Sequence, residues 1–202
     1  MLITETITDF SKLASEQKKR FFKKIWIFDQ QIFPNSSVEE IYNFVHDVDA
    51  VSVKVIHYYH EGKLIGQNVL PILKLSLDGK PIFVLSSRAG ILPAYRSGHR
   101  TLNSAIRVVL NHQIRHLTIP LWFVTTVIQP KVYTIFASRS HNFFPRAERQ
   151  TPQDYLQVLN VVQQRQHEVQ KRREDIFVHP VVMPKVTLNQ LMCLRSKATK
   201  HI

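Results

Sequence analysis

Residues 81–96 read PIFVLSSRAGILPAYR, an apolar run of the kind that forms a buried strand. A short turn, SGHRT at 97–101, leads from it into LNSAIRVVLNHQIRH at 102–116, whose apolar residues recur at helical spacing. A helix that starts after such a turn has free backbone N–H groups at the positive end of its dipole, where anions bind. The stretch therefore predicts either an anion site, with phosphate as the natural ligand, or an ordinary strand-to-helix connection.

The side chains in and beside this turn favour the phosphate interpretation. Small residues let a ligand approach the backbone, and basic side chains add charge-assisted hydrogen bonds. The small residues are Ser97, Gly98 and Thr101, and the basic ones are Arg88, Arg96, His99 and Arg100.

The end of the strand carries a resemblance to a known family. Ile91-Leu92-Pro93-Ala94-Tyr95-Arg96 resembles the V-x-P-x-Y-R strand end that opens the coenzyme A pyrophosphate loop in the GNAT superfamily of N-acetyltransferases. The glycine pattern after it departs from the family. Counted from Arg96, the two glycine positions fall on His99 and Thr101, and Gly98 lies one place early.

This resemblance implies a binding site for acetyl-CoA or another acyl-CoA. The turn would hold the pyrophosphate, and the preceding strand backbone would hold the pantetheine arm and the acyl carbonyl. The positions that the resemblance assigns to the cofactor are Gly90, Ile91, Arg96, Ser97, Gly98, His99, Arg100 and Thr101.

A meander of strands is predicted between Ala50 and the strand of residues 81–96. Its apolar residues alternate, and Asp78-Gly79 is a strong signal for a tight hairpin. A second resemblance lies here, because EGKLIG at 61–66 is similar to a hairpin sequence common in the GNAT superfamily, (D/E)-G-x-(L/I)-(V/I)-G. Pro71 predicts a bulge or a break in the middle strand, since proline cannot donate to the ladder.

Two helices are expected before this meander. Residues 11–33 form an amphipathic, strongly basic pattern, which suits either a core helix with a solvated lysine face or a surface for nucleic acid or membrane. Ser37 followed by Glu40 predicts a capping box for a short helix over Val38–His46.

The order of these elements is itself the GNAT order: helix, helix, three meandering strands, helix. The fold expected is α/β of the α+β kind, with a mixed, mainly antiparallel central sheet flanked by helices. We expect a single domain over 1–202, with a core at about 10–145 and a divergent extension at about 146–202. That extension contains an extra C-terminal helix, which Thr151 caps and Pro152 begins.

The resemblance also suggests catalytic groups. Leu117–Gln129 is expected to be the strand that splays from its neighbour to admit the acyl-pantetheine arm, followed by a helix from Pro130. Tyr133 is the nearby phenol that would protonate the departing thiolate, although a packed structural tyrosine has the same pattern. His57, or its neighbour Tyr58, or a water relay would act as the base, because carboxylates are scarce around the expected site.

Composition restricts the partners and the chemistry. The net charge of +12 predicts an anionic partner: a nucleotide-bearing cofactor, an acidic acyl carrier protein, a nucleic acid or an anionic membrane. The single cysteine, Cys193, excludes an internal disulfide and fits a reducing compartment, and no apolar run spans a bilayer, so a cytoplasmic location is expected. The ten histidines lack metal-site spacing, and His112 with His116 would need a third ligand to hold zinc.

Two functions follow as hypotheses. The first is an N-acyltransferase that transfers an acetyl or longer acyl group from acyl-CoA to an amine acceptor, a small molecule or a protein, by direct attack. The second is a non-catalytic module of the same fold that binds nucleic acid, an anionic membrane or an acidic carrier protein through basic clusters at 18–24 and 171–173.

Overall fold

A computed structural model of the chain describes residues 2–96, 100–127, 130–165, 170–173 and 176–178. The chain divides into two compact units, Met1–Thr125 and Thr126–Ile202. The expectation of a single domain over 1–202 stays a prediction. The single cysteine, Cys193, lies outside the described residues.

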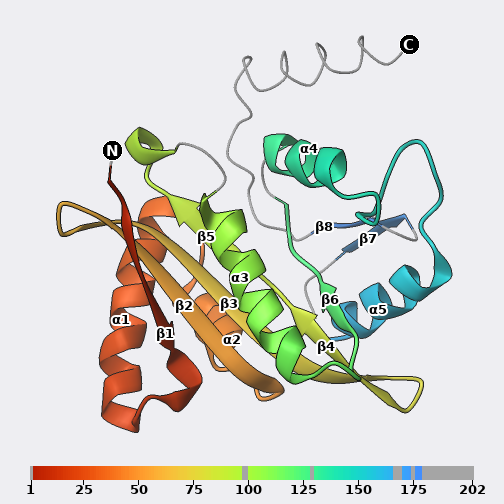
Figure 1. The fold of residues 1–202 in the computed structure, drawn as a ribbon, viewed down its shortest axis with the longest axis horizontal. Coiled ribbons are helices and arrows are strands. Elements are labelled where there is room, and N and C mark those ends of the chain that lie inside the picture. Colours follow the sequence, from red (N-terminus) through yellow and green to blue (C-terminus); the bar gives the residue numbers. More distant parts are fainter. Residues whose placement is uncertain (1, 97–99, 128–129, 166–169, 174–175, 179–202) are drawn as a thin grey trace. The chain divides into compact units, whose positions relative to one another are not determined.

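The first unit contains the predicted helices and meander, preceded by a strand that the sequence pattern did not indicate (Figure 1). Its elements are β1 (Thr4–Asp9), the 3-10 turn η1 (Phe10–Lys12), α1 (Ser15–Ile32), α2 (Val38–Val45), β2 (Ala50–His60), β3 (Lys63–Leu77), β4 (Lys80–Leu85), β5 (Arg88–Ile91), η2 (Pro93–Tyr95), α3 (Arg100–Arg115) and β6 (Leu121–Phe123). The predicted cap of α2 is present, because the Ser37 hydroxyl accepts the Glu40 backbone N–H at 3.0 Å. The strand predicted over Leu117–Gln129 is shorter in the structure, since only β6 pairs.

The six strands of this unit form one mixed sheet, which confirms the predicted fold class. Their order is β1-β2-β3-β4-β6, with β5 pairing β3 beyond β4. The pairs β1·β2, β2·β3, β3·β4 and β3·β5 are antiparallel, and β4·β6 is parallel. The two tight hairpins bear out the turn signals, with positive φ angles at Glu61, Gly62, Asp78 and Gly79.

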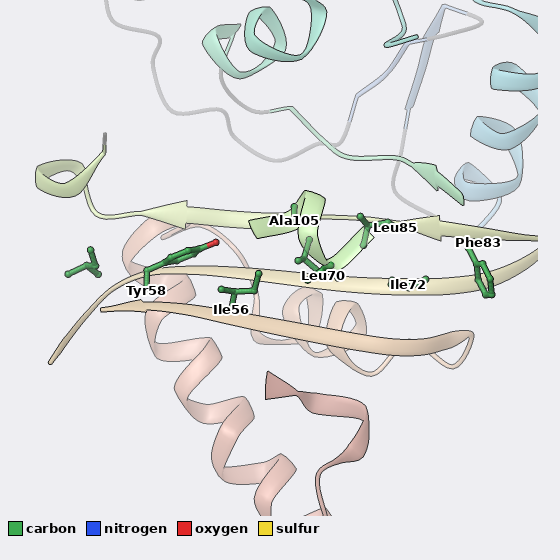
Figure 2. Packing of buried hydrophobic residues seen from close by; sticks show 9 residues of the cluster. Ile56, Tyr58, Leu70, Ile72, Phe83, Leu85 and Ala105 are labelled. Carbon is green, nitrogen blue, oxygen red and sulfur yellow. The ribbon is translucent and has the colours of Figure 1, made fainter. Parts of the chain in front are cut away.

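Helices cover both faces of this sheet, because the strands alternate apolar residues toward each side. On one face, α3 packs on a buried cluster that includes Ile56, Tyr58, Leu70, Ile72, Phe83, Leu85 and Ala105 (Figure 2). On the other, α1 and α2 pack on a second cluster of Phe10, Ile25, Ile41, Val45, Val53, Val55 and Val69. Full burial of each large apolar side chain contributes about 1.5–3 kcal/mol.

Pro71 interrupts the strand beside it and not its own. β3 runs unbroken through Pro71, which corrects the expected break. The interruption lies in the chain that pairs with β3, where β4 ends before Ser86 and β5 begins after Ser87. Ser86 N–H donates to the Pro71 carbonyl at 3.1 Å, but Pro71 has no N–H to return. The register is the same on both sides of this gap, since Ile72 faces Leu85 as Val69 faces Arg88.

The described residues of the second unit form two helices and a pair of short strands. These are α4 (Pro130–Arg139), α5 (Gln153–Gln163), β7 (Gln170–Arg173) and β8 (Ile176–Val178), with β7 and β8 antiparallel. α5 is the predicted extra helix, although it ends earlier than its sequence pattern suggested. Val158 and Val162 are its buried residues. Among the described residues of the whole chain, no helix is both long enough and apolar enough to cross a membrane.

Candidate functional site

The candidate site is built on the main chain of β5. The Leu92 N–H donates to the Ile65 carbonyl at 2.9 Å, which identifies that pair as hydrogen-bonded. Hydrogen-bonded pairs alternate along an antiparallel ladder, so Gly90 also directs its main-chain groups toward β3. Ala89 and Ile91 then direct theirs to the opposite edge. Of the two residues predicted to hold the acyl arm, Ile91 therefore directs its amide outward, whereas Gly90 directs its amide toward β3.

The described residues after β6 form hydrogen bonds with the outward edge only just before β5 begins. Val124 N–H donates to the Leu85 carbonyl at 2.9 Å, and the Thr125 hydroxyl donates to the Ser87 carbonyl at 3.1 Å. In the described part of the first unit, β3 is the strand that pairs with β5, and nothing pairs with its outward edge. Within the described residues of the first unit, the N–H groups of Ala89 and Ile91 have no strand partner, so this edge is suited to pair with an extended ligand as with an added strand.

Arg96 closes the end of this edge. Its Nε donates to the Ile91 carbonyl at 2.8 Å, across the 3-10 turn η2, and its side chain is exposed. The interaction holds the guanidinium beside the last outward amide of β5. The role of Arg96 toward a cofactor stays a prediction.

Asn68 joins β5 to the start of α3. Its Nδ2 donates to the Thr101 carbonyl at 3.3 Å, and its Oδ1 accepts the Ser87 hydroxyl at 2.9 Å. One buried side chain of β3 thus positions both the strand edge and the first helical turn. Sequence reasoning missed Asn68, because its role depends on pairing between distant segments.

Two buried polar groups under the first turn of α3 have no hydrogen-bond partner among the described residues. They are the hydroxyl of Tyr58, which is fully buried, and Nε of Arg100. Burial raises the pKa of Tyr58, and the nearby Ser104, the positive charge of Arg100 and Asn68 oppose that rise because they favour the phenolate. Unpartnered buried polar groups are rare in native proteins, so these two groups distinguish this helix end.

A carboxylate from β1 anchors the same helix. Glu5 accepts the Ser104 hydroxyl at 2.8 Å and forms an ion pair with Arg107. Glu5 faces Tyr58 across the β1·β2 pair. This interaction ties the first strand to α3, and sequence reasoning missed it because β1 was not recognised.

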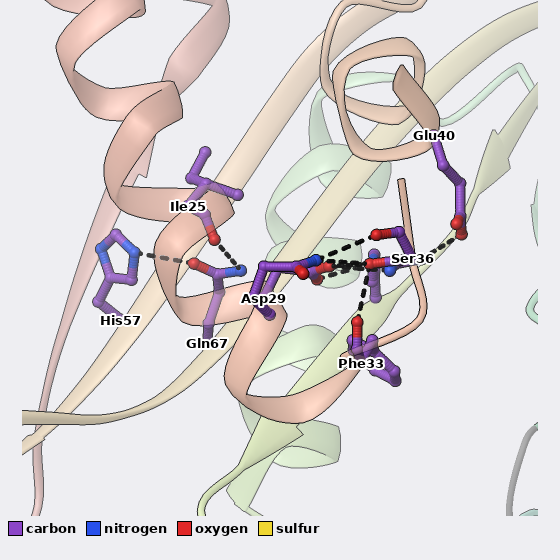
Figure 3. Close-up of polar contacts among 9 residues, drawn as sticks. Ile25, Asp29, Phe33, Ser36, Glu40, His57 and Gln67 are labelled. Carbon is purple, nitrogen blue, oxygen red and sulfur yellow. Dashed lines mark hydrogen bonds and ion pairs between the residues drawn. The ribbon is translucent and has the colours of Figure 1, made fainter. Parts of the chain in front are cut away.

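Arg88 does not belong to the anion site that the sequence suggested. Its side chain binds Asp29 of α1 with two hydrogen bonds, of 2.7 and 2.8 Å, and Glu40 of α2 at 2.6 Å. Ser36 donates a further hydrogen bond to Asp29 at 2.9 Å (Figure 3). Arg88 faces α1 and α2 because it lies opposite Val69 in the ladder, and its charge is neutralised inside the protein.

His57 lies in the core beneath α1. It is 1% exposed, its Nε2 lies 3.2 Å from Oε1 of Gln67, and Gln67 donates to the Ile25 carbonyl (Figure 3). Burial, and secondly the charge of Lys24, lower the pKa of His57 to about 4. An enclosed, neutral imidazole whose ring nitrogen is engaged has the features of a structural histidine, and its surroundings offer no route for an incoming amine.

Tyr133 belongs to the second unit. Its hydroxyl donates to the Pro145 carbonyl at 2.7 Å, and its ring lies 5.7 Å from that of Phe143. The phenol proton is therefore engaged locally, and its role as an acid toward the thiolate stays a prediction.

The absence of a side chain at Gly90 serves packing. A Cβ on Gly90 would lie 2.4 Å from Cγ2 of Ile32, so α1 packs against the bare backbone. Ser97, Gly98 and His99 lie outside the described residues.

The described residues contain no group of three or more side chains able to hold a metal ion. The rings of His112 and His116 lie 4.6 Å apart beside Phe83, so they form a packed pair.

Two helices, a meander, a helix, and then a strand parallel to β4 follow one another in the first unit. This order of elements is the one that the resemblance to the GNAT superfamily implies. No protein-family model matches the chain, and no curated protein matches it. Solved structures similar to it include an aminoglycoside N-acetyltransferase in complex with CoA, at 12% identity, covering 76% of this chain and 97% of that one, with a TM-score of 0.48.

Two further solved structures are similar to this chain. A ribosomal-protein-alanine N-acetyltransferase from Brucella melitensis biovar Abortus 2308 is 9% identical, covering 74% of this chain and 100% of that one, with a TM-score of 0.43. A predicted acetyltransferase with acetyl-CoA from Clostridium acetobutylicum is 11% identical, covering 74% and 94%, with a TM-score of 0.43. At these identities the likeness is one of backbone arrangement.

Proposed function

We propose that this protein is an N-acyltransferase that uses acetyl-CoA or another acyl-CoA as donor and an amine as acceptor. The observation that carries the proposal is the open edge of β5, where the amides of Ala89 and Ile91 point outward immediately before the start of α3. An extended arm that contains amide groups suits such an edge, and an anionic group suits the helix start.

The described residues fit a coenzyme of this kind. The arm of coenzyme A carries amides that can pair with the β5 edge, and its phosphates suit the first turn of α3. Arg96 is exposed at the end of that edge, and Nε of Arg100 is a buried donor without a partner. When bound, the coenzyme supplies the activated acyl group as a thioester.

The protein's contribution to the reaction is mainly positioning. The amine nitrogen forms a bond to the acyl carbon, the carbon–sulfur bond breaks, the amine loses a proton and the thiolate gains one. An outward N–H of β5 is suited to polarise the carbonyl, because a fixed backbone donor stabilises the developing oxyanion. The proton passes to water in this scheme, since His57 is enclosed in the core.

Thermal unfolding of the full chain with acetyl-CoA, a long-chain acyl-CoA and free CoA tests the proposal. A ligand at about one hundred times its dissociation constant stabilises the native state by about 2.7 kcal/mol. Release of free thiol from the donor that stabilises the protein, measured with and without amine acceptors, then tests transfer.

Arg100→Gln is the informative variant, with Arg115→Gln at the far end of α3 as its control. Loss of a charge-assisted contact predicts an affinity about tenfold weaker for the first variant and unchanged for the second. Absence of stabilisation by all three ligands, or equal losses in the two variants, would contradict a coenzyme site at the start of α3.

A further inference from the structure

A groove runs along the outer side of α1. Its volume is about 330 Å³, which is within the range of binding clefts. We call it the α1 groove. Its lining residues are Arg20, Lys23, Lys24, Ile27, Phe28, Gln31 and Leu64.

The spacing of these residues explains the groove. Arg20, Lys23, Lys24, Ile27 and Gln31 recur three or four positions apart, so they form one stripe of the helix. Leu64, at the start of β3, adds a wall from the hairpin that precedes it.

The groove has an apolar centre. Ile27 is 54% exposed, although it lies midway along an amphipathic helix, and the adjacent Phe28 is 2% exposed. Ile27 therefore offers an apolar contact surface beside the cations that line the groove. The centre fits one or two apolar side chains of a partner.

Other lysines of α1 are already engaged away from this groove. The ammonium of Lys18 lies 5.8 Å from the ring centroid of Phe10, and Lys19 pairs with Glu16 at 2.8 Å. The basic cluster predicted at residues 18–24 is therefore divided, and it does not present one continuous row of charge.

The cations that do line the groove are uncompensated. Lys24 donates to the Tyr59 hydroxyl at 2.7 Å, which orients the ammonium without neutralising it. Arg20 and Lys23 are exposed, and the described residues that line the groove include no carboxylate. Three positive charges on the N-terminal side of Ile27 along the helix, together with that apolar side chain, complement a ligand that is both anionic and apolar.

We propose that the α1 groove docks an acidic segment of a partner protein, in which an apolar side chain is flanked by carboxylates. The apolar side chain packs on Ile27 and Leu64, and the carboxylates bind Arg20 and Lys23. A nucleic acid needs a longer row of cations along its phosphates, and a membrane surface needs a broader apolar face. The groove provides a short concave site, which suits a protein segment.

Binding of a defined set of short synthetic peptides to the full chain tests this proposal. Each peptide carries one central Leu, Ile or Phe flanked by Glu or Asp at helical or extended spacing, and its matched control carries Gln or Asn instead. We expect peptides of the acidic set to bind, and their amide controls to bind about tenfold more weakly because the charge pairs are lost.

Variants of the groove locate the binding. Arg20→Glu with Lys23→Glu should weaken binding of the acidic peptides at least about tenfold. Ile27→Gln should weaken it without any change of charge. Lys12→Glu with Lys19→Glu is the matched control, because it changes net charge equally at exposed positions outside the groove.

Three results would overturn the proposal. The first is that no acidic peptide binds the wild-type chain, and the second is that the control pair weakens binding as much as the groove pair. The third is that single-stranded DNA or phosphatidylglycerol vesicles bind through Arg20 and Lys23 while the peptides do not, which would assign the groove to a different class of partner.

Discussion

The two faces of the sheet treat their buried polar groups differently. On the α1 and α2 face, Arg88 binds both Asp29 and Glu40, and His57 binds Gln67. On the α3 face, the Tyr58 hydroxyl and Nε of Arg100 have no hydrogen-bond partner among the described residues. The buried polar groups named on the α1 and α2 face are all paired, whereas the α3 face contains buried polar groups without a described partner.

This difference separates structure from function within one small unit. A buried polar group without a partner costs stability, so a protein retains such groups mainly where a ligand completes them. The α1 and α2 face holds the elements together. At the α3 face and the outward edge of β5, a ligand would form the most new hydrogen bonds with the protein.

The largest effect is expected where a completed interaction is broken. Asp29→Ala leaves the guanidinium of Arg88 buried with Glu40 as its remaining partner, so unfolding in urea should show a loss of about 3–5 kcal/mol. Glu16→Ala, which removes an exposed pair on the same helix, should change stability by less than about 1 kcal/mol. A loss for Asp29→Ala as small as that of the control would break the comparison between the faces.

Acid should weaken the same face through His57. Its pKa is about 4 when folded, below the ordinary 6.5, so the unfolded chain binds a proton that the native protein excludes. Stability is complete above pH 6.5 and falls as the pH drops toward 4, by about 3 kcal/mol in total. Urea unfolding across this pH range measures the slope.

His57→Gln should flatten this slope, because the titrating group is gone. A profile for His57→Gln as steep as the wild type would assign the acid sensitivity to other groups.

A smaller loss is expected where α1 packs on β5. Gly90→Ala places a methyl group 2.4 Å from Ile32, and overpacking of this kind costs about 1–3 kcal/mol. Ile32→Ala removes the two nearest atoms, so the double variant should lose less than the sum of the single variants. A double-mutant cycle in urea measures that coupling, and strict additivity would contradict the close contact.

The smallest effect is expected at the open face. Tyr58→Phe removes a hydroxyl that has no partner, so stability should stay within about 0.5 kcal/mol of wild type or rise. Ser104→Ala removes a real hydrogen bond to Glu5 nearby and should cost about 1 kcal/mol. Calorimetry separates the two, and a clear loss for Tyr58→Phe would sharpen the comparison by revealing a native partner of that hydroxyl.

The local elements of the first unit were predictable because their signals are short in sequence. Asp78-Gly79 marks a hairpin, and Ser37 with Glu40 marks a helix start, without reference to any distant residue. The strand Thr4–Asp9 was missed because it is an edge strand with exposed positions along it, so its alternation of apolar residues is weak.

The candidate site was predictable only in part, because its decisive property is register. Sequence reasoning located the strand and the helix start, and the role of Arg96, which lies at the end of that strand, stays a prediction. Which residues of β5 point outward depends on how β5 pairs with β3, and one step of register exchanges Gly90 for Ile91 and moves Arg88 to the other face. Asn68 became visible only when that pairing was known.

Pro71, a residue of β3, accounts for an interruption in the neighbouring strand, between β4 and β5. β4 and β5 share one register and would form a single long strand if residue 71 could donate its missing hydrogen bond. The interruption between β4 and β5, beside the edge at which a ligand would bind, is therefore determined by a residue of β3. Stiffening that edge would begin with a substitution in a strand that no ligand needs to touch.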